Sequence, residues 1–150
     1  MATGFGLGRA PFAPGTVASA ATALLLWLVP FSRPGLVLFL LAVTLGGTWA
    51  AHEAERWLGT KDPGVIVVDE VAGMTLAVIA FPLTPAVLAA GFVLFRIFDV
   101  MKPSPAREIQ RVRGGAGIML DDLVAGLYAL GLLALSRALW GWPCPRWPSL

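Results

Sequence analysis

Five of the nine acidic residues in this 150-residue chain stand in three short groups beside apolar stretches. They are Asp69, Glu70, Asp99, Asp121 and Asp122. Ionisable groups beside apolar segments are costly, so they indicate a functional site before they indicate a structural role. The chain has only one histidine and one cysteine, so a site rich in nitrogen or sulfur ligands is excluded. A set of oxygen ligands suits a hard divalent cation, and Mg²⁺ is the first expectation.

Each acidic pair also has a structural explanation. Asp69 and Glu70 follow the apolar run 65–68, where they would cap a helix and complement its dipole. Capping accounts for one acid better than for two. Asp121 and Asp122 follow a glycine-rich stretch whose backbone N–H groups could bind phosphate. Two carboxylates there would repel phosphate unless a metal ion lay between them, so both interpretations stay open.

Arg96, Asp99 and Lys102 are spaced so that they share one face of a helix. One interpretation is a salt-bridge ladder that satisfies its own charges. The other places Asp99 on the metal and Lys102 on a phosphate group. Pro103 stops the helix and fixes Lys102 at its end.

The opening segment 4–16 is rich in glycine and proline and ends at Thr16. It lacks the Lys-Ser/Thr ending of a P-loop, which argues against a nucleoside triphosphate site. It is either a plain lead-in or a nest of backbone N–H groups that binds an anion.

The composition identifies the class of protein that must position these residues. Hydrophobic residues make up 57% and charged residues 13%, about half of what a soluble domain carries. These values exclude a disordered chain, a nucleic-acid-binding arm and an ordinary soluble enzyme. The net charge of +2 is too small to indicate a polyanion partner. A membrane protein is therefore expected, and about 20 residues per crossing allow about five crossings.

The apolar pattern predicts an all-α polytopic membrane helix bundle, with about five hydrophobic helical segments in one domain, 1–150. The segments are 17–31, 35–51, 70–84, 86–98 and 118–140, with a short helical pattern at 52–58 that ends at Gly59. The third is about 22 Å long, against about 30 Å of hydrocarbon. The third and fourth segments could therefore form a re-entrant hairpin, and a full crossing also stays open.

Lysine and arginine positions predict the orientation of this bundle. With the N-terminus in the cytoplasm, seven of these residues fall on the cytoplasmic face and three on the far side. The C-terminus is then outside. All nine acids fall on the cytoplasmic face, so the metal site is expected at that end of the bundle.

Several phosphatase chemistries can be excluded by spacing. Cys144 has no arginine six positions later, and one histidine cannot support a two-histidine mechanism. A closer rival is a phosphotransferase acting on CDP-alcohols. Ala106-Arg107 and Gly117 with Asp121 echo the second half of its motif. Its leading aspartate pair is missing, and Ala125 replaces its final aspartate.

Four stretches, in order, resemble the phosphatidylglycerophosphatase A family: 4–16, 62–73, 95–105 and 114–126. Met101 and Ser104 depart from the usual aromatic residues of the family. The resemblance implies a Mg²⁺-dependent hydrolase of the bacterial inner membrane. Its substrate would be an anionic phospholipid, phosphatidylglycerol phosphate, converted to phosphatidylglycerol on the way to cardiolipin, and no nucleic-acid partner is expected.

We expect the acids to supply the metal site and the basic residues to hold the substrate. The predicted ligands of one or two Mg²⁺ ions are Asp69, Glu70, Asp99, Asp121 and Asp122. The predicted phosphate-binding residues are Thr16, Arg96, Lys102 and Arg107. Lys102 is also expected to act in catalysis by stabilising the phosphoryl charge. Asp69 or Asp99 would be a general base or a covalent nucleophile.

Two functions of other classes stay open on the sequence alone. The phosphotransferase would need a CDP-linked donor and would release CMP. A non-enzymatic membrane bundle, such as a transporter subunit or assembly factor, would lose folding or transport, but no phosphate release, when single carboxylates are removed.

Overall fold

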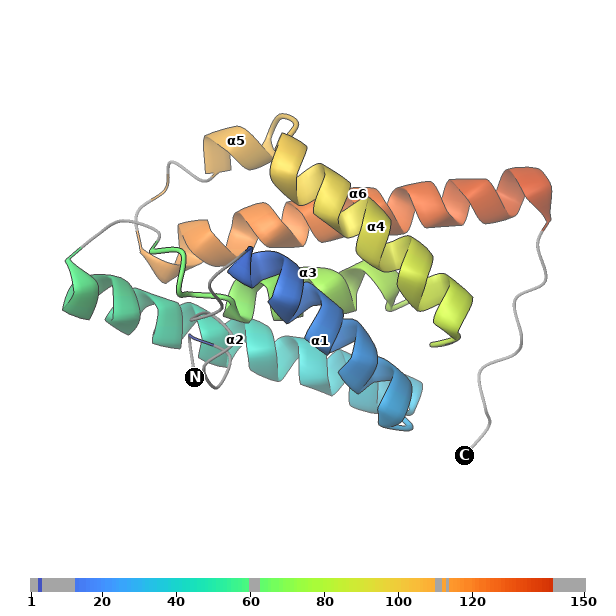
Figure 1. Cartoon of the computed structure of the whole chain (residues 1–150), viewed down its shortest axis with the longest axis horizontal. Coiled ribbons are helices and arrows are strands. Elements are labelled where there is room, and N and C mark those ends of the chain that lie inside the picture. Colours follow the sequence, from blue (N-terminus) through green and yellow to red (C-terminus); the bar gives the residue numbers. More distant parts are fainter. Residues whose placement is uncertain (1–2, 4–12, 60–62, 110–111, 113, 142–150) are drawn as a thin grey trace.

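The structure is a computed structural model that describes residues 3, 13–59, 63–109, 112 and 114–141. Within these residues it contains six helices and no strand (Figure 1). The helices are α1 (Pro14–Leu28), α2 (Arg33–Leu58), α3 (Val68–Val78), α4 (Pro85–Met101), α5 (Ala106–Ile109) and α6 (Gly115–Trp140). The all-α prediction is confirmed for this part of the chain. Most of the opening segment, together with Lys61, Asp62, Arg111, Arg113 and Cys144, lies outside it.

The helix boundaries follow local capping signals. Ser32 begins α2, since its hydroxyl accepts a hydrogen bond from the Gly35 N–H at 3.2 Å. Gly59 ends α2 in the left-handed conformation, with φ of 66°. The structure differs from the predicted separation of 35–51 and 52–58, because a single helix covers both. No residue before Gly59 stops the helix, so the polar stretch continues the apolar one.

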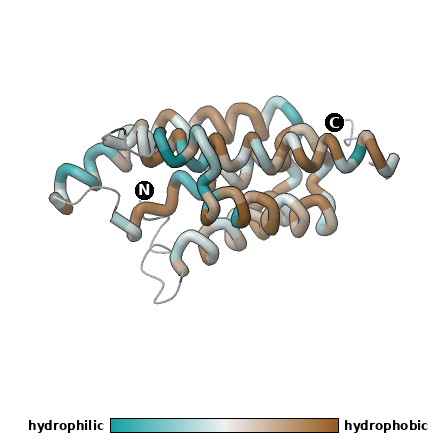
Figure 2. Tube along the Cα trace, turned by 90° about the horizontal axis from the view of Figure 1, so that it is seen from above, coloured by the Kyte–Doolittle hydropathy of each residue, from teal (hydrophilic) through white to brown (hydrophobic). Residues whose placement is uncertain are grey.

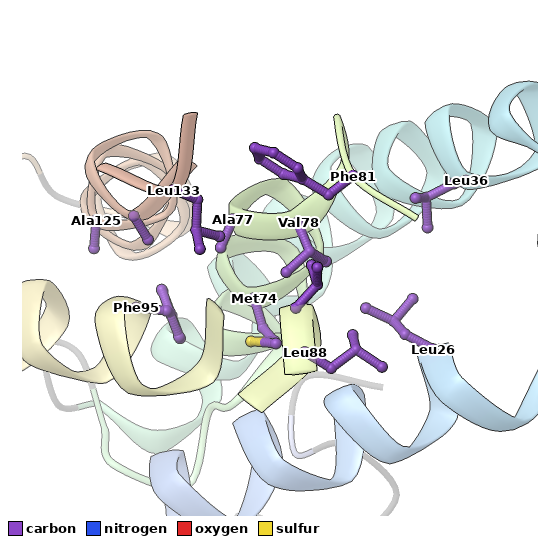
Figure 3. Close-up of a cluster of buried hydrophobic side chains, with 12 residues drawn as sticks. Leu26, Leu36, Met74, Ala77, Val78, Phe81, Leu88, Phe95, Ala125 and Leu133 are labelled. Carbon is purple, nitrogen blue, oxygen red and sulfur yellow. The ribbon is translucent and has the colours of Figure 1, made fainter. Parts of the chain in front are cut away.

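Helix α3 is the centre of the bundle and packs against α1, α2, α4 and α6 (Figure 1). Seven of its eleven residues are buried. Met74 and Val78 of α3 meet Phe95 of α4, Leu133 of α6 and Leu26 of α1 in the main hydrophobic core (Figure 3). This packing is what holds the first turn of α3, and therefore Asp69 and Glu70, against the neighbouring helices.

Two glycines let α3 and α6 approach each other closely. A Cβ atom added at Gly126 of α6 would lie 2.5 Å from the backbone oxygen of Gly73. A Cβ atom added at Gly73 would lie 2.7 Å from the backbone oxygen of Asp122. The close contact therefore brings α3 directly beside the backbone of the acidic pair on α6.

We expect Gly126→Ala to destabilise the protein by about 1–3 kcal/mol, because the methyl group meets backbone that cannot move aside. Alanine also favours the helix by about 1 kcal/mol over glycine, and the expected destabilisation is the loss that remains after this gain. Thermal unfolding in detergent measures the change. The matched control is Gly131→Ala on the same helix, where an added Cβ has no atom within 4 Å. Equal melting temperatures for the two variants would contradict the close contact between α3 and α6.

Two of the described helices are long and apolar enough to cross a membrane, namely α2 and α6. Hydrophobic residues run along the helices (Figure 2). The five predicted helical segments correspond to α1, α2, α3, α4 and α6, but the described residues contain two candidate spans, so a count of about five membrane crossings is not confirmed. Helices α1, α3 and α4 have 15, 11 and 17 residues. They are shorter than the roughly 20 residues of a full crossing because capping residues and turns end them early.

Candidate active site

Three carboxylates from α3 and α6 meet inside the bundle. Asp69, Glu70 and Asp122 each offer one oxygen, and these three atoms lie within 4.8 Å of one another. Asp69 and Asp122 are 8% and 3% exposed. We call this set the carboxylate triad. Asp69 and Glu70 stand one helical turn before Gly73 on α3, and Asp122 stands one turn before Gly126 on α6. The geometry of the triad therefore depends on the close contact between α3 and α6 at these glycines.

The triad has unmet hydrogen-bonding capacity. Asp69 Oδ1, Glu70 Oε2 and Asp122 Oδ2 are buried and have no hydrogen-bond partner within the described part of the chain. Burial raises the pKa of Asp69 well above its usual value, and the charges of Asp122 and Glu70 raise it further. Buried carboxylates without a partner cost several kcal/mol unless a counter-charge is present. The arrangement therefore fits a small cation that takes oxygen ligands.

The other two acids are paired with basic side chains. Arg96 donates a hydrogen bond to Asp99, and Lys102 donates one to Asp121. The predicted ladder is therefore half right: its Arg96–Asp99 step forms, but Lys102 reaches across to α6. Asp99 still borders the triad, since its carboxylate lies near enough to interact with that of Asp122. The structure thus divides the five predicted metal ligands into a triad and two ion pairs.

Lys102 lies at the C-cap of α4 in a left-handed conformation, with φ of 42°. Pro103 follows it and prevents the helix from continuing. Burial lowers the pKa of Lys102, but the hydrogen bond and charge of Asp121, with Asp122 and Asp99, outweigh burial and raise it. Lys102 is therefore a fixed positive charge beside the triad at neutral pH.

Tyr128 holds the loop that follows Lys102, and none of the sequence motifs indicated this role. The Tyr128 hydroxyl on α6 donates a hydrogen bond to the backbone oxygen of Ser104 at 2.7 Å. Its ring lies 5.4 Å, centre to centre, from the ring of Phe98 on α4. The available signal was that Tyr128 is the only tyrosine and follows Asp121 by two helical turns.

Two of the predicted phosphate-binding residues lie apart from the triad's direct contacts. Thr16 is half-buried in the first turn of α1, next to Gly15, whose position adjoins Glu70 and Arg96. Arg107 is exposed on α5, and no hydrogen bond or ion pair joins it to an acid among the described residues. Arg96 is close enough to Glu70 to attract it. The structure therefore brings Arg96 and Lys102 to the acids, and places Thr16 nearby.

These features define a class: an all-α protein with apolar, membrane-type helices and a buried carboxylate site beside two fixed positive charges. Residues 1–137 match the family model described as phosphatidylglycerophosphatase A. The chain belongs to the phosphatidylglycerophosphatase A family, whose enzymes are phosphoric monoester hydrolases.

Curated relatives agree with this assignment. The phosphatidylglycerophosphatase A proteins of Escherichia coli and Haemophilus influenzae are 43% and 36% identical to the chain. These matches cover 89% and 87% of this chain, and 79% and 82% of the relatives. A Bacteroides thetaiotaomicron protein, named as a candidate phosphatidylinositol-3-phosphatase, is 40% identical over 91% of both chains. No solved structure matches the chain significantly.

Proposed function

We propose that this protein hydrolyses phosphatidylglycerol phosphate to phosphatidylglycerol and inorganic phosphate, with Mg²⁺ held by the carboxylate triad. The observation that carries the proposal is the cluster of Asp69, Glu70 and Asp122. Each offers one carboxylate oxygen within 4.8 Å of the others, and each has one buried oxygen with no hydrogen-bond partner among the described residues. Ligands that are all oxygen favour Mg²⁺ over the transition metals. The family assignment supplies the substrate class, a phospholipid with a terminal phosphomonoester.

The side chains around the triad support this reaction. A bound divalent cation would neutralise the phosphate charge as a Lewis acid. Lys102 and Arg96 bind and orient the phosphoryl oxygens and stabilise the charge that develops there. Ion pairs with Asp121 and Asp99 hold the side chains of Lys102 and Arg96 in place. Thr16 would add a hydrogen bond from α1, whereas Arg107 would act only on the outer part of the headgroup.

Either Asp69 or Asp99 starts the attack on phosphorus. Asp69 belongs to the triad, and Asp99 lies at its border beside Arg96. Each could accept a proton from the attacking water or attack phosphorus directly. Trapping with hydroxylamine separates these routes, since a captured acyl-phosphate would exclude direct attack by water.

We propose that α2 and α6 cross the inner membrane of a bacterium and that the whole chain acts as one membrane-embedded unit. Both helices expose large apolar side chains, among them Leu45, Trp49 and Leu135. The start of α6 lies against the polar end of α2, since a Cβ added at Gly115 would touch the Thr48 oxygen at 2.0 Å. A Cβ added at Gly47 would meet Met119, so α6 runs from the polar end of α2 toward its apolar part, and the acidic pair lies about two turns along α6 from that end.

Among the described residues, the end of the bundle where α2 ends and α6 begins carries Arg56, Lys102 and Arg107, whereas Arg33 and Arg137 lie at the far end. This distribution favours a cytoplasmic active site and a cytoplasmic N-terminus. Helices α3 and α4 are joined by the short turn 79–84 and would form a hairpin that returns to this side. A phospholipid could then present its phosphate to the triad while its acyl chains stay in the bilayer.

The test is release of inorganic phosphate by the purified protein in detergent. We expect release from phosphatidylglycerol phosphate that requires Mg²⁺ and stops when a chelator is added. Phosphatidylinositol 3-phosphate is assayed in parallel, because one relative bears that name. Preference for the inositol lipid would replace the substrate but keep the reaction class. Release of CMP from a CDP-lipid, without phosphate release, would identify a phosphotransferase instead.

A further inference from the structure

Gly15, in the first turn of α1, touches two side chains of the site. It is buried, and an added Cβ would lie 2.2 Å from Glu70 Oε1. The next nearest atoms would be Arg96 Nη1 at 3.1 Å and Glu70 Cδ at 3.2 Å. All three are at the charged ends of long side chains. Gly15 is thus the residue at which α1 packs against the Glu70 carboxylate and the Arg96 guanidinium.

Other described glycines differ from Gly15 in what they touch. Added Cβ atoms at Gly115, Gly117 and Gly126 would meet backbone oxygens at 2.0, 2.1 and 2.5 Å, so these glycines permit helices or loops to pack. At Gly46 and Gly131 an added Cβ would meet no atom within 4 Å. Only at Gly15, among these, would the required movement fall on side chains of the candidate active site.

The two oxygens of Glu70 have different surroundings. Oε1 lies against the first turn of α1, at the position where a residue-15 side chain would be. Oε2 is buried, has no hydrogen-bond partner in the described residues and belongs to the residue that completes the triad. A side chain at position 15 would push the carboxylate away and turn Oε2 with it. The partial positive charge at the start of α1 also favours the carboxylate in its present place.

We propose that Gly15 is a positioning residue for cation binding: its missing side chain leaves the space that lets Glu70 complete the triad. This inference rests on the proposed divalent cation. The first turn of α1 would then limit where the Glu70 carboxylate can lie and so orient it as a metal ligand. Because a carboxylate end moves at little cost, a larger residue 15 would leave the fold intact and weaken the cation site.

The experiment measures Mg²⁺ and Mn²⁺ binding to the purified full-length protein by titration calorimetry, without substrate. We expect Gly15→Ala to weaken binding by about tenfold, as loss of ligand positioning does elsewhere. The control, Gly131→Ala, should bind as wild type. The melting temperature of Gly15→Ala should not fall, because alanine favours the helix. Wild-type affinity in Gly15→Ala, or a clear loss of its thermal stability, would overturn the inference.

A second background separates positioning from a general disturbance. In Glu70→Asp the carboxylate is one methylene shorter and withdraws from position 15. We expect Gly15→Ala to cost no more than about twofold in this background, well below its cost in wild type. Equal costs in both backgrounds would overturn the inference. A wild-type protein that binds neither cation would instead refute the proposed function, so the two failures are distinct.

Discussion

Asp122→Asn is expected to lower Mg²⁺-dependent phosphate release by on the order of 10³-fold or more. Asp122 belongs to the triad, and its Oδ2 is buried with no hydrogen-bond partner among the described residues. The amide has the same shape but no charge, so α6 stays in place while the site loses a ligand. A metal ion supplies several kcal/mol of charge stabilisation, and each 1.4 kcal/mol is about tenfold in rate. Steady-state phosphate release against Mg²⁺ concentration measures the loss.

The neighbouring Asp121→Asn is the matched control for this prediction. Asp121 is as deeply buried as Asp122 but forms an ion pair with Lys102. Its amide should leave cation binding within about threefold of wild type and lower kcat, because Lys102 loses the partner that holds it. If both variants lost cation affinity equally, the division into a triad and two ion pairs would be wrong, and all five acids would have to be treated as ligands.

Lys102→Met should reduce kcat by about 10²–10³-fold, the usual loss when one group that stabilises developing charge is removed. Lys102 keeps its positive charge because the carboxylates around it raise its pKa. Methionine retains the length and apolar stem of the side chain but removes the charge. We expect a smaller change in KM than in kcat, because the stabilisation is greatest in the transition state. Phosphate release over a range of substrate concentrations separates the two constants.

The double variant Lys102→Met/Asp121→Asn tests whether Lys102 acts on the substrate or only neutralises Asp121. Removing both charges leaves no unpaired buried carboxylate at this position. Thermal stability should therefore recover relative to Lys102→Met, while kcat stays low. Recovery of kcat in the double variant would show that Lys102 serves Asp121 alone and has no part in the reaction.

Local features of the chain were predictable because they depend on residues close in sequence. The Arg96–Asp99 ion pair follows from a spacing of three within one helix. Gly59 was predicted to end a helix, and it does so at the end of α2. The number of spans was not predictable from composition. Apolar segments such as α3 become core helices, since packing on all sides buries them as effectively as lipid would.

Residue types and spacing along the chain are enough to predict helical segments, three groups of carboxylates, the basic residues Arg96 and Lys102 beside them, and the ordered motifs of the family. Which acids cluster and which form ion pairs depends on how the helices pack. Lys102 and Asp121 are 19 residues apart and meet because α4 and α6 pack together. The triad and the space at Gly15 likewise depend on how closely α1, α3 and α6 approach, which non-local packing sets and local spacing does not.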